Sequence, residues 1–522
     1  MKHELSNQHF LILAVLILIA SFFIRIFNLS SNPPGFFADE AAIGYNAYSL
    51  LKTGADEYHK SFPIFFRSFG DYRLPIPIYA NLPFIAILGL SEVSVRMTTI
   101  FFGLVSILFL MLFVRELRGN LAGVCVGVLL MVLPWHIHLS RWGSEYMSFP
   151  AFLSISLYGY SVSVKRPRML LLSFAFFALT LYTYYPTLFV TPLFMVGLVM
   201  YRFLSLKKER GLLLISCIAF FLICLPLLFA LKNGTLITRW NSVQSQKVSV
   251  SQKAIQALTT YKDAYTPDFL FLKGDVGMPE HAITRHSVRG FGELYLFQII
   301  LIPVGLFLAL RKSKNGDAFL MLWLLLLYPL GSALTSDGIL STRSVIGIIP
   351  LSFFSAIGLA GLVIIMLKKF HALLTILLLS VFALIMLFSS GMYLRAYYRD
   401  YPLYSADFWG WQEGPKYIMQ YFLANKDRYD DLYMSGEYNS GEIFLKFYDP
   451  TNICSSKCKM GDFMRQPELY NPARKQLFAL SPEYIAQSPL DTRFKTLHNV
   501  YYPNGTVAFK IGVIVYPSTF KM

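Results

Sequence analysis

The sequence contains few charged residues, few cysteines and no internal repeat. Asp, Glu, Lys and Arg make up 15% of the 522 residues, whereas 55% are hydrophobic. Soluble globular domains carry about 25% charged residues, so this composition excludes an ordinary soluble protein. A net charge of +16 raises the question of nucleic-acid binding. The basic residues, however, form short clusters between apolar segments, which is typical of membrane proteins and argues against a nucleic-acid partner.

The five cysteines offer one candidate disulfide. Cys125, Cys217 and Cys224 lie inside apolar segments, where a free cysteine packs as a small hydrophobic residue. Cys454 and Cys458 lie in the polar stretch CSSKC. If this stretch faces an oxidising compartment, the two can form a disulfide. A metal site is the weaker alternative, because no other Cys or His lies close by in the sequence.

Apolar segments of spanning length dominate the first three quarters of the chain. At about 20 residues per helix, the sequence predicts an all-α bundle of about 11 transmembrane helices. The fifth and sixth segments form one run that is too long for a single span, so we divide it at Pro186. The first is too long for a cleaved signal peptide and has no small-residue cleavage site after it. The segments are 10–29, 95–114, 120–139, 147–164, 169–185, 186–204, 211–231, 291–310, 317–335, 344–366 and 371–393.

Every second short loop between these segments is basic. Short loops rich in Lys and Arg stay in the cytoplasm, so the pattern predicts a multi-pass protein of the plasma membrane with its N-terminus inside. The loops 30–94 and 232–290 and the tail 394–522 are then outside. The basic loops carry Arg115 and Arg118, the sequence KRPR at 165–168, the residues Arg202, Lys207, Lys208 and Arg210, then Arg311, Lys312 and Lys314, and finally Lys368 and Lys369.

These boundaries divide the chain into a transmembrane catalytic domain, 1–393, and a small extracytoplasmic α/β domain, 394–522. Within the second, we predict a helix over 413–425, a strand over 430–435 and a hairpin around the Pro-Asn-Gly turn at 503–505. In the first outer loop, residues 75–90 are apolar but too short to span, and they predict a helix at the outer interface.

An acidic pair, Asp39 and Glu40 in GFFADEAAIGYNAY, follows the first apolar segment. Acidic residues stabilise the first turn of a helix through its dipole, and this is one interpretation of the pair. The other is a carboxylate held at the membrane interface as a general base. The sequence around the pair leaves both open.

Further polar residues gather at the outer ends of the predicted spans. Each has an ordinary explanation, because Arg, Tyr and Trp anchor helices at interfaces and Arg141 with Glu145 has the spacing of a helical ion pair. Together they indicate that any chemistry lies on the outer face, since the inner loops are short and merely basic. They are Asp71 and Arg73 in FGDYRLP, His136, His138, Arg141 and Glu145 in PWHIHLSRWGSE, Tyr182 and Tyr184 in LYTYYP, Arg285, His286 and Arg289 in TRHSVRGFGELY, and Asp337 and Arg343 in TSDGILSTRS.

Five of these features occur in one order: Asp39-Glu40, GDYRLP, LSEVSVRMTTIFFG at 90–103, PWHIHLSRWGSE and RHSVRGFGELY. In them the chain resembles the GT-C class of membrane glycosyltransferases, nearest the branch of protein O-mannosyltransferases and the lipid A aminoarabinose transferase. The resemblance covers about residues 1–395. Where relatives often have Lys-Pro-Pro, this chain has Arg73-Leu74-Pro75, which keeps a cation and loses one proline.

The resemblance implies an enzyme that moves a hexose or pentose from a polyprenyl-phosphate carrier to a protein, lipid or glycan acceptor on the outer face, with inversion. Such a displacement needs one base, and phosphate leaves without a strong acid, unlike the leaving group of a glycosidase. It implies Asp39 as the base and Glu40 as its partner, or as a ligand of an acceptor hydroxyl or cation.

The resemblance further implies that guanidinium groups bind the departing phosphate, with Arg73 as the first candidate before Arg343 and Arg285. Asp71 is expected to hold Arg73. A divalent metal is not required, and no ligand set for one is apparent. The remaining residues expected around the substrates are His136, His138, Arg141, Glu145, Tyr182, Tyr184 and His286.

Three other classes stay open. A transporter or flippase of lipid-linked saccharides is one, but such proteins often have inverted repeats and charges within spans, and both are scarce here. An envelope scaffold would not need the polar residues of the outer face. An oligosaccharide ligase or polymerase shares the architecture and uses a pyrophosphate donor.

Overall fold

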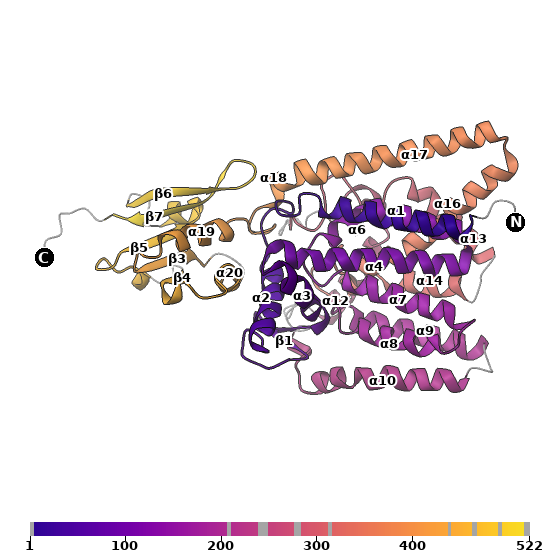
Figure 1. Cartoon of the computed structure of the whole chain (residues 1–522), viewed down its shortest axis with the longest axis horizontal. Helices are drawn as coiled ribbons and strands as arrows, with labels where there is room; N and C mark the ends of the chain where they lie inside the picture. The colour runs from indigo at the N-terminus through magenta and orange to yellow at the C-terminus, as the bar shows by residue number, and fades with distance from the viewer. Residues whose placement is uncertain are drawn as a thin grey trace.

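The computed structural model describes residues 5–205, 210–238, 249–275, 283–311, 316–436, 440–461, 467–488 and 493–515. It consists of a bundle of helices with a smaller, sheet-containing region at one end (Figure 1). The N-terminus lies at the opposite end of the bundle. The predicted class, an α-helical membrane bundle with a small C-terminal α/β region, is confirmed.

Each predicted span contains a helix, but their lengths differ. Among the described residues, six helices are long and apolar enough to cross a membrane, and α5 with α6, bent by 61°, makes a seventh. The bundle helices are α1 (Asn7–Ile26), α4 (Glu92–Arg118), α5 (Asn120–Val132), α6 (Pro134–Ser140), α7 (Ser148–Ser163), α8 (Met169–Thr180), α9 (Thr187–Ser205), α10 (Arg210–Lys232), α13 (Gln298–Arg311), α14 (Asp317–Leu327), α15 (Leu330–Ala333), α16 (Ile348–Lys369) and α17 (Ala372–Arg395).

Proline and chain continuity explain where the prediction and the structure differ. The division at Pro186 is correct, because α8 ends at Thr180 and α9 begins at Thr187. The α5–α6 break comes at Pro134, whose ring cannot continue a straight helix. Beyond α17, the π-turn η4 (Ala396–Asp400) and α18 (Tyr401–Ser405) continue the same helical path past the predicted end at 393.

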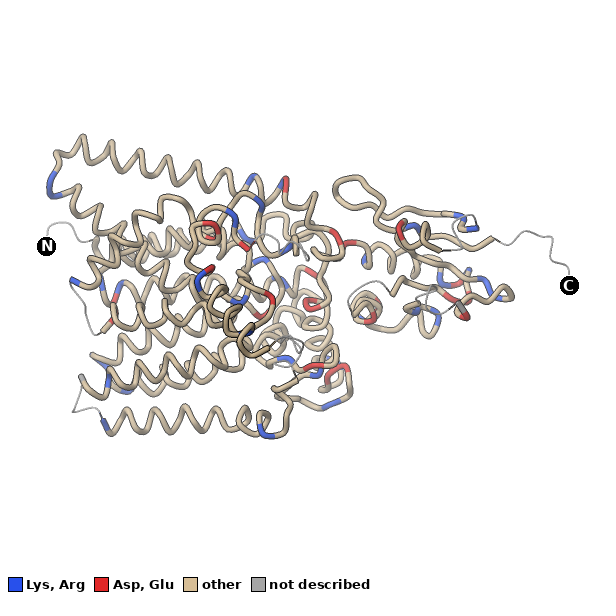
Figure 2. Tube along the Cα trace, turned by 180° about the vertical axis from the view of Figure 1, so that it is seen from behind, with Lys and Arg blue, Asp and Glu red and all other residues tan. Residues whose placement is uncertain are grey.

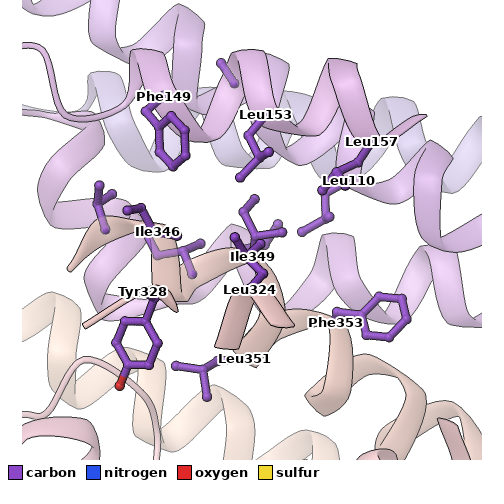
Figure 3. Close-up of a cluster of buried hydrophobic side chains, with 14 of the residues drawn as sticks. Leu110, Phe149, Leu153, Leu157, Leu324, Tyr328, Ile346, Ile349, Leu351 and Phe353 are labelled. Carbon is purple, nitrogen blue, oxygen red and sulfur yellow. The ribbon is translucent and has the colours of Figure 1, made fainter. Parts of the chain in front are cut away.

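The bundle is apolar both inside and outside. Figure 3 shows side chains of α4, α7, α14 and α16 packed together, among them Leu110, Phe149, Leu324 and Phe353. The outward faces are also apolar, and α17 exposes 63–75% of Leu373, Leu384, Leu387 and Phe388. A soluble surface does not carry such a contiguous apolar face, so the chain is a multi-pass membrane protein.

Charged residues are sparse between the N-terminal end of the bundle and its middle, and more frequent toward the C-terminal region (Figure 2). At the end remote from the C-terminal region, two ion pairs join neighbouring loops. Lys165 Nζ lies 2.6 Å from Glu116 Oε1, and Arg118 lies 2.5 Å from Asp317 Oδ2. The helix ends next to the clusters predicted to be cytoplasmic, those of α4, α7, α9, α13 and α16, lie at this end (Figure 1). Lys207, Lys208, Lys312 and Lys314 lie outside the described residues.

The part of the bundle next to the C-terminal region carries short elements that build the site described below. They include a hairpin of β1 and β2 in which Ser68 pairs with Asp71, so Phe69 and Gly70 form the turn. Both turn residues have positive φ, 53° and 78°, as a two-residue hairpin turn requires. The predicted interfacial helix is α3. The elements are α2 (Ala38–Thr53), β1 (Phe66–Ser68), β2 (Asp71–Arg73), α3 (Pro75–Leu88), α12 (Val250–Asp263), η2 (Asp268–Leu272) and η3 (Val345–Gly347).

The C-terminal region contains a five-stranded sheet in the order β4-β3-β5-β7-β6. Strands β3, β4 and β5 are parallel, whereas β7 runs antiparallel to β5 and β6. The predicted helix, strand and hairpin are α19, β3 and β6–β7, and Cys454 and Cys458 form a disulfide. The elements are α19 (Pro415–Asn425), β3 (Asp431–Ser435), α20 (Glu442–Tyr448), η5 (Ser455–Lys457), β4 (Cys458–Gly461), η6 (Pro467–Leu469), β5 (Gln476–Leu480), α21 (Pro482–Gln487), β6 (Phe494–Tyr501) and β7 (Val507–Ile514).

Helix α2 joins the two parts of the molecule. Its residues Ala38, Ala41 and Ala42 belong to the same buried cluster as Phe422 and Phe447 of the C-terminal region. Glu57, which follows α2, pairs with Lys446 of α20 at 2.9 Å. The helix that carries the acidic pair is therefore held between the bundle and the C-terminal region.

Candidate active site

A cavity of about 450 Å³ opens at the end of the bundle that carries the C-terminal region. Its walls come from α2, the β1–β2 hairpin, α3, the segment after α6, the α8–α9 connection and the segments around residues 283–286 and 337–343. Eight of the thirteen predicted site residues line it. They are Asp39, Asp71, Arg73, Glu145, Tyr184, Arg285, His286 and Arg343.

Asp39 lies in the first turn of α2 and faces this cavity. Its Oδ1 accepts a hydrogen bond from Arg73 at 2.5 Å, and 23% of its side chain is exposed. In the described part of the chain, Oδ2 has no hydrogen-bond partner. The positive end of the α2 dipole also favours the ionised carboxylate. Asp39 thus offers one oxygen to Arg73 and the other to the cavity.

Arg73 is bound by two carboxylates. Besides Asp39, its guanidinium contacts Glu145 Oε2 at 3.3 Å, and its Nε donates to Ser68 Oγ at 3.2 Å. Burial alone would lower the pKa of Arg73, but the charges of Asp39 and Glu145 raise it overall. Because Arg73 already contacts two carboxylates, it is less available to a phosphate than a cation without such partners.

Arg285 is the cation that lacks such partners. In the described ranges, no carboxylate lies within ion-pair distance of it, and its buried Nε has no hydrogen-bond partner. One terminal nitrogen donates to the carbonyl oxygens of Trp409 and Gly410, and the guanidinium lies 3.9 Å from the centre of the Phe37 ring. Burial lowers the pKa of Arg285. An incoming anion would therefore relieve a buried charge that is incompletely paired.

Arg343, on the same cavity, is already paired. It lies 2.6 Å from Asp337 Oδ2 and donates to the Thr335 hydroxyl at 2.5 Å. Asp337 is 46% exposed.

Asp71 accepts from the backbone N–H of Tyr72 at 2.6 Å and from the Thr238 hydroxyl at 3.3 Å. Arg73 itself is held by Asp39 and Glu145, rather than mainly by Asp71 as the sequence suggested.

Glu40, in contrast to its neighbour, is fully buried and does not line the cavity. It pairs with Arg96 at 3.1 Å and accepts the backbone N–H of Phe37 at 3.0 Å and of Gly143 at 2.7 Å. Glu40 therefore fixes the start of α2 against α4 and the segment after α6. In this arrangement it reaches neither an acceptor hydroxyl nor a metal cation in the cavity.

Four other predicted pocket residues are also buried away from the cavity, so their predicted position in its lining is wrong. His136 lies between Arg25 and Ser106, 2.8 Å from each, and the Tyr182 hydroxyl donates to the Ile223 carbonyl at 2.5 Å. The Arg141 guanidinium binds backbone carbonyls, including that of Phe27 at 2.9 Å. His138 Nε2 contacts the Arg285 carbonyl oxygen at 2.7 Å, so it acts on the site only by supporting that backbone.

Several residues around the cavity were missed from the sequence. Tyr146 and Tyr185 line it, and the Tyr185 hydroxyl donates to the Tyr72 carbonyl oxygen at 2.6 Å. Asp275 lies behind His286. Arg96, the partner of Glu40, lies in the stretch LSEVSVRMTT. The resemblance of this stretch to the GT-C class is the one sequence signal that could have revealed Arg96.

Within the described residues, no three His, Cys, Asp or Glu side chains form a group that could hold a metal ion.

We expect Glu40→Gln to destabilise the protein strongly, because it leaves the Arg96 charge buried without its partner. Breaking a buried ion pair on one side costs about 3–5 kcal/mol. Thermal unfolding in detergent would show a clear fall in the transition midpoint. Glu116→Gln is the matched control, since Lys165 is 73% exposed and such a pair contributes about 0–1 kcal/mol. Equal midpoints for the two variants would contradict this account of Glu40.

Comparison with known proteins places this geometry in a known fold. No family model matches the sequence, and no curated protein matches it either. Among solved structures, ArnT from Cupriavidus metallidurans bound to undecaprenyl phosphate has a TM-score of 0.53 and 13% identity, with 97% of this chain and 98% of ArnT covered.

Two structures of the Archaeoglobus fulgidus oligosaccharyltransferase are also similar, each with a TM-score of 0.57. The form tethered to an acceptor peptide is 12% identical, with 97% of this chain and 74% of that chain covered. The form with an inhibitory peptide and a dolichol-phosphate, named AglB, is 11% identical, with 96% and 74% covered. At these identities the likeness establishes the fold alone, and this chain has the GT-C fold that ArnT and the oligosaccharyltransferase share.

Proposed function

We propose that the protein is an integral membrane glycosyltransferase. It moves a hexose or pentose from a polyprenyl-phosphate donor to an acceptor on the outer face, with inversion at the sugar. The observation that carries this proposal is one cavity that holds the Asp39 carboxylate and the carboxylate-free cation Arg285. The acceptor is a protein, a lipid or a glycan.

The fold supports the nature of the donor. ArnT, which shares this architecture over nearly the whole chain, was solved with undecaprenyl phosphate, and AglB was solved with a dolichol-phosphate. A lipid-linked phosphate enters from the membrane, and the cavity lies at the outer end of an apolar bundle. The position of the cavity thus suits a lipid-linked donor, and the charge of Arg285 suits the phosphate of that donor.

In this proposal Asp39 is the general base. The acceptor hydroxyl binds Oδ2 and gives up its proton as its oxygen attacks the sugar carbon. Arg73 holds Oδ1 and orients the carboxylate, while Glu145 fixes Arg73 from the other side. Tyr184 contributes to the wall around the sugar. A base positioned in this way contributes about 10²–10⁴-fold to the rate.

Arg285 receives the departing phosphate. The bond from the sugar carbon to the phosphate oxygen breaks, its electron pair stays on that oxygen, and the phosphate becomes more negative. Arg285 lies at a buried position where its charge is weakly screened, so it stabilises this change. Arg343 is the second candidate for binding the phosphate. It takes this role when its ion pair with the half-exposed Asp337 breaks. Arg73, the first choice from sequence, serves the base instead.

The proposed orientation places the N-terminus in the cytoplasm and the cavity outside the plasma membrane, together with the C-terminal domain, 394–522. The transmembrane catalytic domain is 1–393. We expect a cysteine introduced at Asn504 to react with a membrane-impermeant maleimide on intact cells, and one at Lys165 to react only after lysis. Labelling in the reverse order would contradict this orientation.

Two alternative functions make different predictions in one experiment. The purified protein in liposomes is given sugars linked to polyprenyl phosphate or polyprenyl pyrophosphate, with envelope extract as acceptor. We expect release of free polyprenyl phosphate from a monophosphate donor. Release from pyrophosphate donors alone would indicate a ligase or polymerase. Movement of intact donor across the bilayer without release would indicate a transporter or flippase.

A further inference from the structure

His286 has a carboxylate on one side and the cavity on the other. Its Nδ1 lies 3.3 Å from Asp275 Oδ2, and the His286 side chain is 6% exposed. It nevertheless lines the cavity next to Arg285. Nδ1 is buried and faces Asp275 without making a hydrogen bond in the described part of the chain. Because the two nitrogens of an imidazole point in different directions, Nε2 is the nitrogen left for a group in the cavity.

Asp275 is itself fixed. Its Oδ2 accepts the backbone N–H of Ser341 at 2.8 Å and the Ser341 hydroxyl at 2.9 Å. The Ser341 hydroxyl also lies 3.0 Å from the His286 carbonyl oxygen. Asp275 thus places a fixed carboxylate beside Nδ1, and the Ser341 hydroxyl contacts both Asp275 and the His286 backbone.

The charged groups around His286 place it on the phosphate side of the cavity. Arg285 is its chain neighbour and Arg343 is close enough to affect its charge. Buried Glu293 lies near Asp275, and His138 lies behind on α6. Burial lowers the pKa of His286, Asp275 raises it in part, and the two arginines lower it further. Burial and the two arginines thus disfavour the charged imidazolium while no anion is bound.

We propose that His286 binds the phosphate of the lipid carrier through Nε2 and becomes protonated when that phosphate is bound. This role rests on the proposed function. It adds to the phosphate site a group whose charge changes with pH. The proton comes from solvent, because the proton of the acceptor hydroxyl goes to Asp39. As the bond to the sugar breaks, the phosphate gains a second negative charge, and the Nε2–H of the imidazolium faces that charge.

The chemistry of the product matches such a partner. A phosphate monoester has a second pKa of about 6, and an unperturbed histidine titrates at about 6.5. The two groups can share one proton near neutral pH. The charge of Arg285 stays constant between pH 6 and 8, whereas the charge of His286 changes, so His286 adds its own pH dependence to binding of the released carrier.

The test is the protonation state of His286 with and without undecaprenyl phosphate. Full-length protein in nanodiscs is labelled with ¹⁵N-histidine, and the imidazole signals are recorded at pH 7.5. The chain has nine histidines, so His286→Asn identifies the signal. We expect neutral His286 without lipid, and an imidazolium signal after lipid is added. Asp275→Asn should prevent this change, whereas His9→Gln, at the far end of the bundle, should not.

A second measurement tests the proposal if the variants used for the imidazole signals fold poorly. The affinity of wild-type protein for undecaprenyl phosphate is expected to rise more steeply as pH falls from 8 to 6 than that of His286→Gln. If the lipid binds while His286 stays neutral and both slopes agree, this inference is overturned and the proposed function stands. If undecaprenyl phosphate does not bind to the wild type at all, both are overturned.

Discussion

Asp39→Asn is expected to lower the rate of sugar transfer by about 10²–10⁴-fold, while substrate binding changes little. The amide keeps the size of the side chain and can still accept a bond from Arg73, but it cannot take the proton of the acceptor hydroxyl. The measurement is the initial rate of polyprenyl phosphate release in liposomes at saturating donor. The loss should appear in kcat rather than in KM.

Asp71→Asn is the matched comparison for this prediction. Asp71 lines the same cavity, yet its carboxylate binds Tyr72 and Thr238 rather than Arg73. Its amide variant should lose far less activity than the Asp39 variant. Both proteins must keep the wild-type unfolding midpoint, since Asp39 also lies in the first turn of α2. A folded Asp39→Asn protein with wild-type kcat would remove Asp39 as the base.

Arg285→Ala is expected to lower kcat/KM by about 10²–10³-fold, as removal of one preorganised transition-state ligand does. The reason is that Arg285 is buried and free of carboxylates in the described part of the chain, so its charge is available to the phosphate. Release of polyprenyl phosphate at low donor concentration measures this effect directly.

Arg289→Ala provides the control for charge alone. Arg289 belongs to the same segment but lies over the Tyr404 ring, with its guanidinium 4.2 Å from the ring centre, and does not line the cavity. We expect near wild-type activity from this variant. If both variants lost activity equally, the arginines would act through the general charge of the outer face rather than through a phosphate at Arg285.

The fold was largely predictable because the bilayer imposes a length and a polarity on each helix. The eleven apolar segments and the division at Pro186 follow from these two constraints. Helix lengths were harder to predict, since apolar residues continue through the Pro134 break and through the turn at 396–400. Nothing in local hydropathy distinguishes a straight helix from a bent one, and the proline signals only where a bend can occur.

The site was predictable to the level of the segment and not of the side chain. Asp39 and Glu40 are neighbours, but successive helical residues point about 100° apart, so one faces the cavity and the other faces Arg96. His136 and Arg141 likewise turn inward. The ranking of Arg73 above Arg285 failed to anticipate the contacts of Glu145, 72 residues from Arg73 in sequence. Partners brought together by the tertiary fold decide which charge is available.

The most direct test of the central claim is an experimental structure of the protein with undecaprenyl phosphate in a lipid nanodisc. We predict phosphate density in the outer cavity, within hydrogen-bond distance of the Arg285 guanidinium and on the opposite side of the bound sugar position from Asp39 Oδ2. Phosphate density at the basic loops of the other end of the bundle, with the outer cavity empty, would contradict the account.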